Sequence, residues 1–129
     1  SQDTFGVLEF DVTVTMYNPH VGQTDSTPNE TADGTIINPK KASEYRYVAL
    51  SRDLIARWGG PFNYGDYVMI KGTDGYDGVY QVKDTMSPKF INRVDILRTG
   101  GSKWFKFDNV VLYRYFKYDQ VTLHKHEKP

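Results

Sequence analysis

Hydrophobic and polar positions alternate most regularly in residues 5–17. In an extended chain this period of two places one set of side chains on a single face, and that set is Leu8, Phe10, Val12 and Val14. The pattern predicts a half-buried strand. Thr15 and Tyr17 leave together from its polar face, one residue before Asn18-Pro19 ends it.

Shorter runs of β-forming residues predict further strands, at residues 45–50, 67–71, 109–115 and 119–124. Residues 51–58 are predicted to form a brief helix with Ser51 as its N-cap, ended by Gly59-Gly60-Pro61. A second short helical turn is predicted around residues 102–107.

The central segment, residues 78–97, is predicted to be two strands joined by the turn Met86-Ser87-Pro88-Lys89. Each strand carries one carboxylate. Asp84 ends the first strand, and Asp95 lies in the second strand facing away from its hydrophobic neighbours. Asp95 is then either an ordinary water-facing acid or a carboxylate held in a cleft, with a raised pKa suited to acid and base catalysis.

The segment between the first two strands, residues 18–44, is long and polar, and a loop of this length in a compact domain is typically functional or disordered. We expect a functional loop. The chain contains three histidines, His20, His124 and His126, which we expect to be solvated rather than bound to metal. Asp74 and Asp77 lie among glycines in a spacing that favours turn chemistry over a calcium loop.

Length and composition narrow the class of protein. A chain of 129 residues predicts one domain, residues 1–129, with its core at about residues 7–116. The formal net charge of zero argues against nucleic acid as a partner, and no hydrophobic run approaches a membrane span. Without cysteine there is no disulfide framework or thiol chemistry. We expect no cofactor and no metal. Six or seven short strands indicate a small mixed or antiparallel barrel.

Several motifs occur in an order that resembles the 3D domain family, which is named for three aspartates. The motif T-x-Y ends the first strand, and T-A-x-G follows in the loop. A D-T motif and an R-V-D motif come later, with their aspartates eleven positions apart. The resemblance covers residues 12–115. It implies a mainly β fold, a six-stranded double-psi β-barrel with one or two short helices, as in MltA-type lytic transglycosylases, stationary-phase survival proteins and, more distantly, RlpA and expansins.

The resemblance also assigns residues. Asp95 matches the family's catalytic acid and Asp84 its second aspartate; Ser51 stands where the first is found, with Asp53 nearby. The residues implied to contact substrate are Thr15, Tyr17, Thr31 and Lys89, the last of these in the turn that replaces the family's glycines.

The chemistry implied by the resemblance is non-hydrolytic cleavage of the MurNAc–GlcNAc bond of peptidoglycan, giving 1,6-anhydro products. Asp95 would protonate the glycosidic oxygen and then accept the proton of the sugar's C6 hydroxyl. Its pKa would be raised either by desolvation or by the negative charge of Asp84, which would also orient Asp95 by hydrogen bonding. The alternative is an expansin-like module that binds a cell-wall glycan without cutting it. Either implies a bacterial protein of the cell envelope or the secreted fraction.

Overall fold

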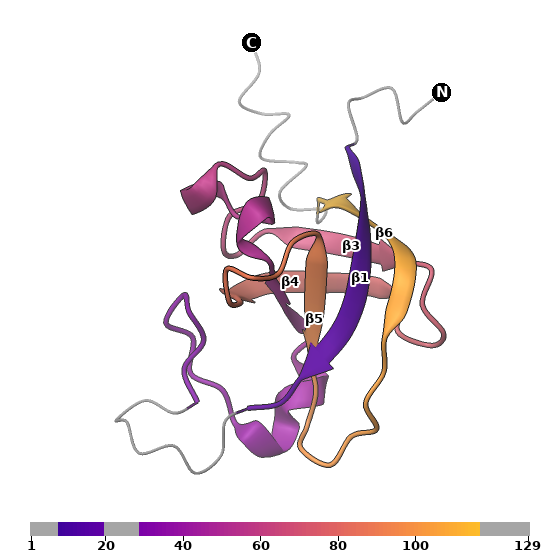
Figure 1. Ribbon diagram of the computed structural model, residues 1–129. Coiled ribbons are helices and arrows are strands. Elements are labelled where there is room, and N and C mark those ends of the chain that lie inside the picture. The colour runs from indigo at the N-terminus through magenta and orange to yellow at the C-terminus, as the bar shows by residue number, and fades with distance from the viewer. Residues whose placement is uncertain (1–7, 20–28, 117–129) are drawn as a thin grey trace.

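The computed structural model describes residues 8–19 and 29–116, which form one mainly β unit built on a six-stranded sheet (Figure 1). The strands are β1 (Glu9–Tyr17), β2 (Tyr47–Leu50), β3 (Tyr67–Lys71), β4 (Gly78–Thr85), β5 (Arg93–Leu97) and β6 (Phe107–Tyr115). The helices are short 3-10 turns: η2 (Pro39–Glu44), η3 (Arg52–Leu54) and η4 (Ala56–Trp58).

The sheet closes on itself. Its strand order is β1-β5-β2-β4-β3-β6, and β6 pairs back with β1. Two pairings are parallel, β1 with β5 and β2 with β4, and the other four are antiparallel. The predicted mixed sheet of about six strands is therefore confirmed.

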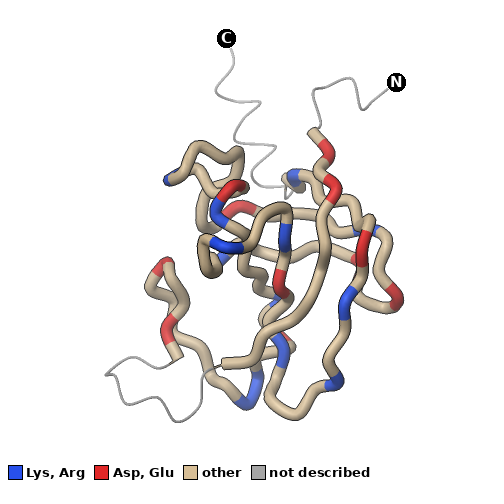
Figure 2. Tube along the Cα trace, in the orientation of Figure 1, with Lys and Arg blue, Asp and Glu red and all other residues tan. Residues whose placement is uncertain are grey.

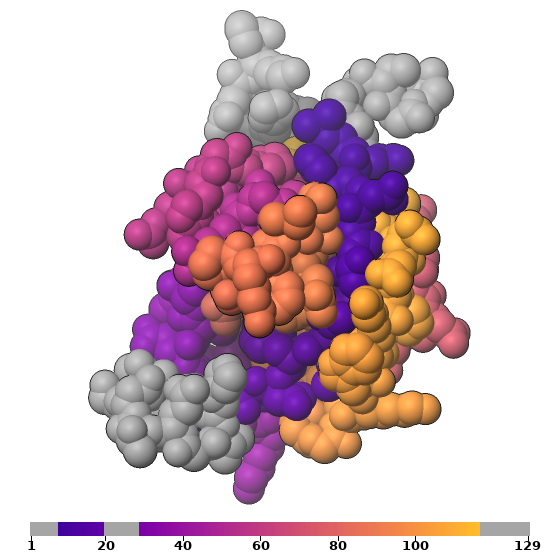
Figure 3. Space-filling view, in the orientation of Figure 1, coloured from indigo at the N-terminus to yellow at the C-terminus, as the bar shows by residue number. Residues whose placement is uncertain are grey.

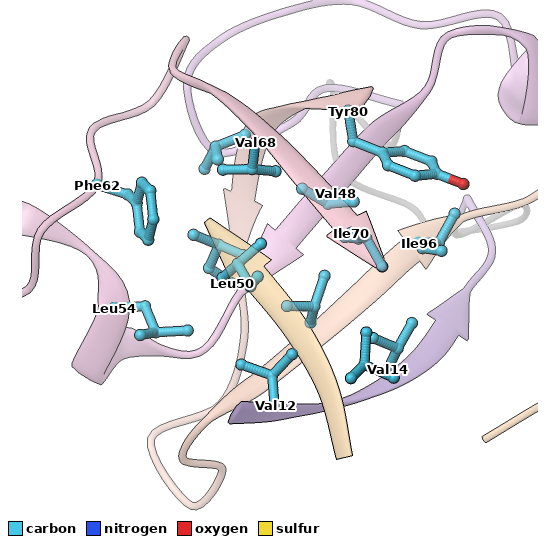
Figure 4. Packing of buried hydrophobic residues seen from close by; sticks show 14 of the residues in the cluster. Val12, Val14, Val48, Leu50, Leu54, Phe62, Val68, Ile70, Tyr80 and Ile96 are labelled. Atoms are coloured by element: carbon cyan, nitrogen blue, oxygen red, sulfur yellow. The ribbon is translucent and has the colours of Figure 1, made fainter. Parts of the chain in front are cut away.

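Each strand contributes two alternating side chains to one hydrophobic core (Figure 4). From β1 these are Val12 and Val14, which are 3% and 0% exposed. Branched residues suit such inward positions because they pack well against neighbours on a pleated surface. A closed sheet of only six strands has an interior filled by its own side chains. A ligand must therefore bind on the outer face or at the rim.

The first and second strands differ slightly from prediction. β1 ends at Tyr17 as expected, but Leu8 lies just outside it and is 64% exposed rather than part of the buried face. β2 begins two residues later than predicted. Arg46 has a φ of +58°, a left-handed conformation that an extended strand does not contain.

The predicted helix over residues 51–58 is instead two 3-10 turns, η3 and η4. The prediction that Ser51 caps a helix with its side chain is wrong. The hydroxyl oxygen of Ser51 accepts a hydrogen bond from the backbone N–H of Arg93, 2.9 Å away in β5. Gly59 does end the segment, in the left-handed conformation with φ of +93° that glycine adopts without strain.

No helix forms at residues 102–107, contrary to prediction; β6 already begins at Phe107. The reason is aromatic packing. Phe105 stacks on Tyr76 with ring centroids 4.1 Å apart, and Phe107 lies 6.0 Å from the same ring. Side chains two residues apart in an extended segment reach one ring more readily than they would from a helical turn.

The long polar segment contains structure where the sequence predicted only a loop. Glu30 and Ile36 form a β-bridge, and η2 follows. We call residues 30–36 the hairpin. The strand predicted at residues 119–124 and the three histidines lie outside the described residues. In the part of the chain that is described, no helix has the length and hydrophobicity needed to cross a membrane.

Candidate functional site

One row of residues crosses four adjacent strands. Thr15 of β1 pairs with Asp95 of β5, Asp95 pairs with Ala49 of β2, and Ala49 pairs with Asp84 of β4. We call these four residues the row. Asp95 faces outward as predicted, because its neighbours Val94 and Ile96 are 0% and 1% exposed in the core. The parallel β1–β5 pairing thus places Thr15 beside Asp95, and the small Ala49 separates the two aspartates.

Asp95 is held by Thr15. The Thr15 hydroxyl donates a hydrogen bond to Oδ1 of Asp95, and the same hydroxyl oxygen accepts one from Nε of Arg93 at 3.2 Å. Burial raises the pKa of Asp95, and this outweighs the lowering effects of the Thr15 hydrogen bond and the Arg93 charge. The net result is a carboxyl group that retains its proton more readily than an exposed aspartate does.

Asp84 lies in a different environment. Its Oδ1 accepts hydrogen bonds from the backbone N–H groups of Thr85 at 3.0 Å and Ala32 at 3.2 Å, so it attaches the hairpin to the end of β4. Burial raises the pKa of Asp84, and the two backbone hydrogen bonds oppose this.

Tyr17 lies against Asp84. Burial and the negative charges of Asp84 and Asp95 together raise the pKa of the Tyr17 hydroxyl well above its usual value. This hydroxyl is buried and makes no hydrogen bond of regular geometry with another described residue; the same is true of the side-chain oxygen of Asn29. Both residues line a cavity of about 40 Å³ together with Asp84 and Thr31, which is room for one water or hydroxyl group.

Of the two expected sources of the raised pKa of Asp95, desolvation and the charge of Asp84, burial is the cause, and Asp84 is not among the groups that shift it. Nor does Asp84 orient Asp95 by a hydrogen bond, since Thr15 occupies that role. The two carboxylates do not interact because β2, with Ala49 in the row, lies between the strand of Asp84 and the strand of Asp95.

The hydroxyl of Thr31, a predicted substrate contact, serves the hairpin. It donates to Oδ1 of Asp33 at 2.6 Å, and the Thr31 side chain is buried. Asp33 forms a salt bridge with Lys83 of β4 at 3.1 Å. Burial opposes the ionisation of Asp33, but hydrogen bonds from Thr31, Thr35 and Lys83 outweigh it and lower the pKa. The hairpin is therefore fastened to β4 beside the row.

No carboxylate stands at Ser51, which is 0% exposed and bonded to β5. Asp53 is exposed, and its Oδ2 accepts a hydrogen bond from the backbone N–H of Asn92 at 3.0 Å. Neither residue adds a third carboxylate to the row. Their common role is to tie η3 to the segment that leads into β5.

Lys89 lies in that segment rather than in the row itself. It is exposed, and its Nζ is 5.1 Å from the ring centre of Phe90. Figure 3 shows the segment 85–92 (orange) beside the 51–60 segment (magenta) on one face of the molecule, above the segment that contains the hairpin (purple). The predicted site residues thus separate into a central group around the row and Lys89, which lies in the connection between β4 and β5.

Sequence reasoning missed Ala49 and Tyr64. Burial and the charge of Asp84 raise the pKa of the Tyr64 hydroxyl, whereas Arg57 and Arg52 lower it. Tyr64 therefore lies within electrostatic reach of both the row and η3–η4. The one feature of the sequence that could have drawn attention to Ala49 is its small side chain among the larger hydrophobic residues of the strand at 47–50. No group of three or more His, Cys, Asp or Glu suited to a metal ion occurs among the residues that the structure describes.

The Asp84→Asn and Asp95→Asn variants are each expected to be more stable than the wild type at pH 7. Burial raises both pKa values, so ionisation costs folding free energy as pH rises from the unfolded-state pKa through the folded-state pKa. A tenfold weaker acid in the folded state corresponds to a cost of about 1.4 kcal/mol. The gain should disappear below about pH 3.5, where the wild-type carboxyls are protonated in both states. Urea unfolding at several pH values measures it.

Asp108→Asn is the matched control for this measurement. Asp108 is exposed and also accepts a hydrogen bond from a threonine of β1, Thr13, at 2.8 Å. It should give no comparable gain. Loss of stability at pH 7 in both row variants would contradict the assignment of burial as the cause of the raised pKa values.

A scan against protein-family models finds no match to this chain, and a search of the curated proteins finds none either. The function is therefore inferred from the geometry of the row and from the motifs that surround it.

Proposed function

We propose that this protein is a peptidoglycan-active lytic transglycosylase of the bacterial cell envelope, with Asp95 as its single catalytic acid. The observation that carries the proposal is the Thr15–Asp95 pair, a half-buried carboxyl group with a raised pKa and a fixed orientation on the outer face of the sheet. A general acid needs both properties, since it must carry its proton and present it in one direction.

The pairing pattern supports a double-psi β-barrel as the fold. Strands β1, β2 and β3 correspond in order to β4, β5 and β6. The half-turn that relates them has its axis between β2 and β5 on one side of the closed sheet and between β3 and β6 on the other. The parallel pair β1–β5 then overlies β4–β2, and the antiparallel pair β1–β6 overlies β4–β3. Two interleaved three-strand halves are what a double-psi barrel requires.

In the proposed reaction Asp95 donates its proton to the glycosidic oxygen while the bond to C1 breaks. The C6 hydroxyl oxygen of the same sugar then bonds to C1, and its proton passes to the Asp95 carboxylate. The products are a 1,6-anhydro sugar and a free hydroxyl on the leaving glycan. No water is consumed, and Asp95 ends in the protonated state in which it began.

Thr15 is proposed to orient the acid, and Tyr17 and Asp84 to bind the sugar. The Tyr17 hydroxyl and the Asp84 carboxylate lie against each other and line a space suited to one hydroxyl group. A sugar hydroxyl there could accept a hydrogen bond from the Tyr17 hydroxyl and donate one to the Asp84 carboxylate. Both of its hydrogen-bonding capacities would then be satisfied, as buried polar groups require.

The separation of the two aspartates favours a single-acid mechanism. Adjacent strands are about 4.8 Å apart, so the Cα atoms of Asp84 and Asp95 are about 10 Å apart across Ala49. Retaining glycosidases need their acid and nucleophile about 5–5.5 Å apart. Side chains on the outer, convex face of a closed sheet also diverge, so Asp84 is poorly placed to attack C1.

A non-catalytic glycan-binding module is the second candidate. One observation favours it: Ser51, at the place of a family aspartate, is fully buried and bonded to β5. The site then has two of the three family carboxylates. Such a protein would retain Asp84 and Asp95, the two partly exposed members of the row, as polar contacts for sugar hydroxyls.

Incubation with purified peptidoglycan sacculi separates these candidates. The proposal predicts that the wild type releases soluble muropeptides and that Asp95→Asn releases none while still sedimenting with the sacculi. Sedimentation of both proteins without any release would favour the binding module. Neither release nor sedimentation would overturn both.

A further inference from the structure

Four cationic side chains lie along one edge of the row. We call Arg52, Arg57, Lys89 and Arg93 the basic wall. Figure 2 shows Lys and Arg positions along η3, η4 and the segment that leads into β5. In the sequence these residues fall into two groups, at 52–57 and 89–93, so only the fold brings them together.

Three hydrogen bonds join the two groups into one structure. Nε of Arg52 donates to the carbonyl oxygen of Met86 at 3.2 Å. The backbone N–H of Arg93 bonds to Ser51, and that of Asn92 bonds to Asp53. The wall is therefore a fixed feature of the surface beside the row.

Aromatic rings hold the cationic groups in place. The guanidinium carbons of Arg52 and Arg57 lie 4.8 Å and 5.1 Å from the ring centre of Trp58. Arg93 and Lys89 lie 4.7 Å and 5.1 Å from that of Phe90. Cation–π contacts of this kind reduce the conformational freedom of long side chains without neutralising their charge.

The wall retains its positive charge toward solvent. Among the described residues, none of its four members forms a salt bridge; the two ion pairs found there join Lys83 to Asp33 and Arg114 to Asp66. The nearest acid within the wall itself is Asp53, whose carboxylate accepts a backbone hydrogen bond from Asn92. Asp95 is a second carboxylate within reach of Arg93, and four cations with two carboxylates still leave an excess of positive charge at this edge.

The wall reaches the row at Asp95, and it comes within electrostatic reach of Tyr64, a neighbour of Asp84. Arg93 precedes Asp95 by two residues in β5, so the two side chains share a face, and Arg93 donates to Thr15. Arg52 and Arg57 act on Tyr64, which also responds to the charge of Asp84. A glycan placed over the row therefore meets cationic groups on one side.

We propose that the basic wall binds carboxylate groups of the glycan, so that the substrates are carboxylate-bearing oligosaccharides rather than neutral ones. This inference rests on the proposed function of the row. Guanidinium groups match a carboxylate with two parallel hydrogen bonds, and three of the four wall residues are arginines. In intact peptidoglycan the lactyl carboxyl group is amide-bonded to the stem peptide, so such a carboxylate is supplied either by muramic acid from which the peptide has been removed or by a uronic acid.

Isothermal titration in the Asp95→Asn background, which cannot cut the ligand, tests the proposal. The probes are a GlcNAc–MurNAc tetrasaccharide with free lactyl carboxylates, the same compound with these groups amidated, and a tetragalacturonate. We expect the free acid to bind about 10–100-fold more tightly than the amide at low salt, with the difference shrinking as salt rises. The tetragalacturonate shows whether a uronate carboxylate is accepted as well.

Arg52→Gln/Arg57→Gln should remove most of this preference. Lys103→Gln/Lys106→Gln, which removes the same charge from exposed positions in residues 98–106, should leave it unchanged. Arg57→Gln alone covers the case in which loss of the Arg52 hydrogen bond disturbs folding. Equal affinity for the free acid and the amide, or no affinity for either, would overturn the proposal that the basic wall binds carboxylate groups. Failure to release muropeptides from sacculi overturns the transglycosylase while leaving the binding preference to be measured.

Discussion

Asp95→Asn is expected to lower the rate of peptidoglycan cleavage by about 10²–10⁴-fold, the range for loss of a general acid. An asparagine side chain has nearly the same shape and still accepts the hydrogen bond of Thr15, but it has no acidic proton to transfer to the glycosidic oxygen. The loss should therefore appear in kcat, with little change in KM. Initial rates of muropeptide release from sacculi measure it.

Asp108→Asn is the control. Asp108 also accepts a hydrogen bond from a threonine of β1, and this threonine, Thr13, lies two residues before Thr15. Asp108 lies outside the row, and the variant should retain wild-type activity. An Asp95→Asn enzyme that cleaves as fast as Asp108→Asn would contradict the role of Asp95.

Activity is expected to fall about tenfold per pH unit on the alkaline side of its optimum, since in the proposed reaction only protonated Asp95 can start the cleavage. Burial raises the pKa of Asp95, so this fall begins at a higher pH than for an exposed aspartate. Thr15→Val removes a hydrogen bond that lowers this pKa, and it should move the fall to higher pH. The pH dependence of kcat/KM measures both.

Thr13→Val is the matched control, because the Thr13 hydroxyl bonds to Asp108 instead. Its pH profile should coincide with that of the wild type. A Thr15→Val profile displaced to lower pH would mean that the hydrogen bond between Thr15 and Asp95 does not stabilise the carboxylate as described.

Local sequence pattern predicts much of the strand content. β3 has the predicted bounds, and the alternation in β1 correctly places Val12 and Val14 in the core. Strand partners are not local information, since Thr15 and Asp95 are 80 positions apart. The helical turn predicted at residues 102–107 fails for the same reason, because the contact with Tyr76 that extends this segment is remote in sequence.

The candidate site is predictable only in part. The outward direction of Asp95 follows from its position between two hydrophobic strand residues, and the T-x-Y motif identifies Thr15 and Tyr17. The environment of Asp95 depends on pairing. No local feature indicates that Ala49 lies between the aspartates. The basic wall joins residues from η3, η4 and the approach to β5, so its charges are grouped only after folding.

Mass spectrometry of the fragments released from peptidoglycan, with the reaction run in ¹⁸O-labelled water, tests the central claim most directly. If Asp95 acts as a single acid and base, the wild type releases 1,6-anhydro muropeptides that contain no ¹⁸O, and Asp95→Asn releases almost none. Fragments with a reducing end labelled by ¹⁸O would instead show that a water molecule attacks C1. That result would contradict the lytic mechanism and assign the second carboxylate, Asp84, a role in activating water.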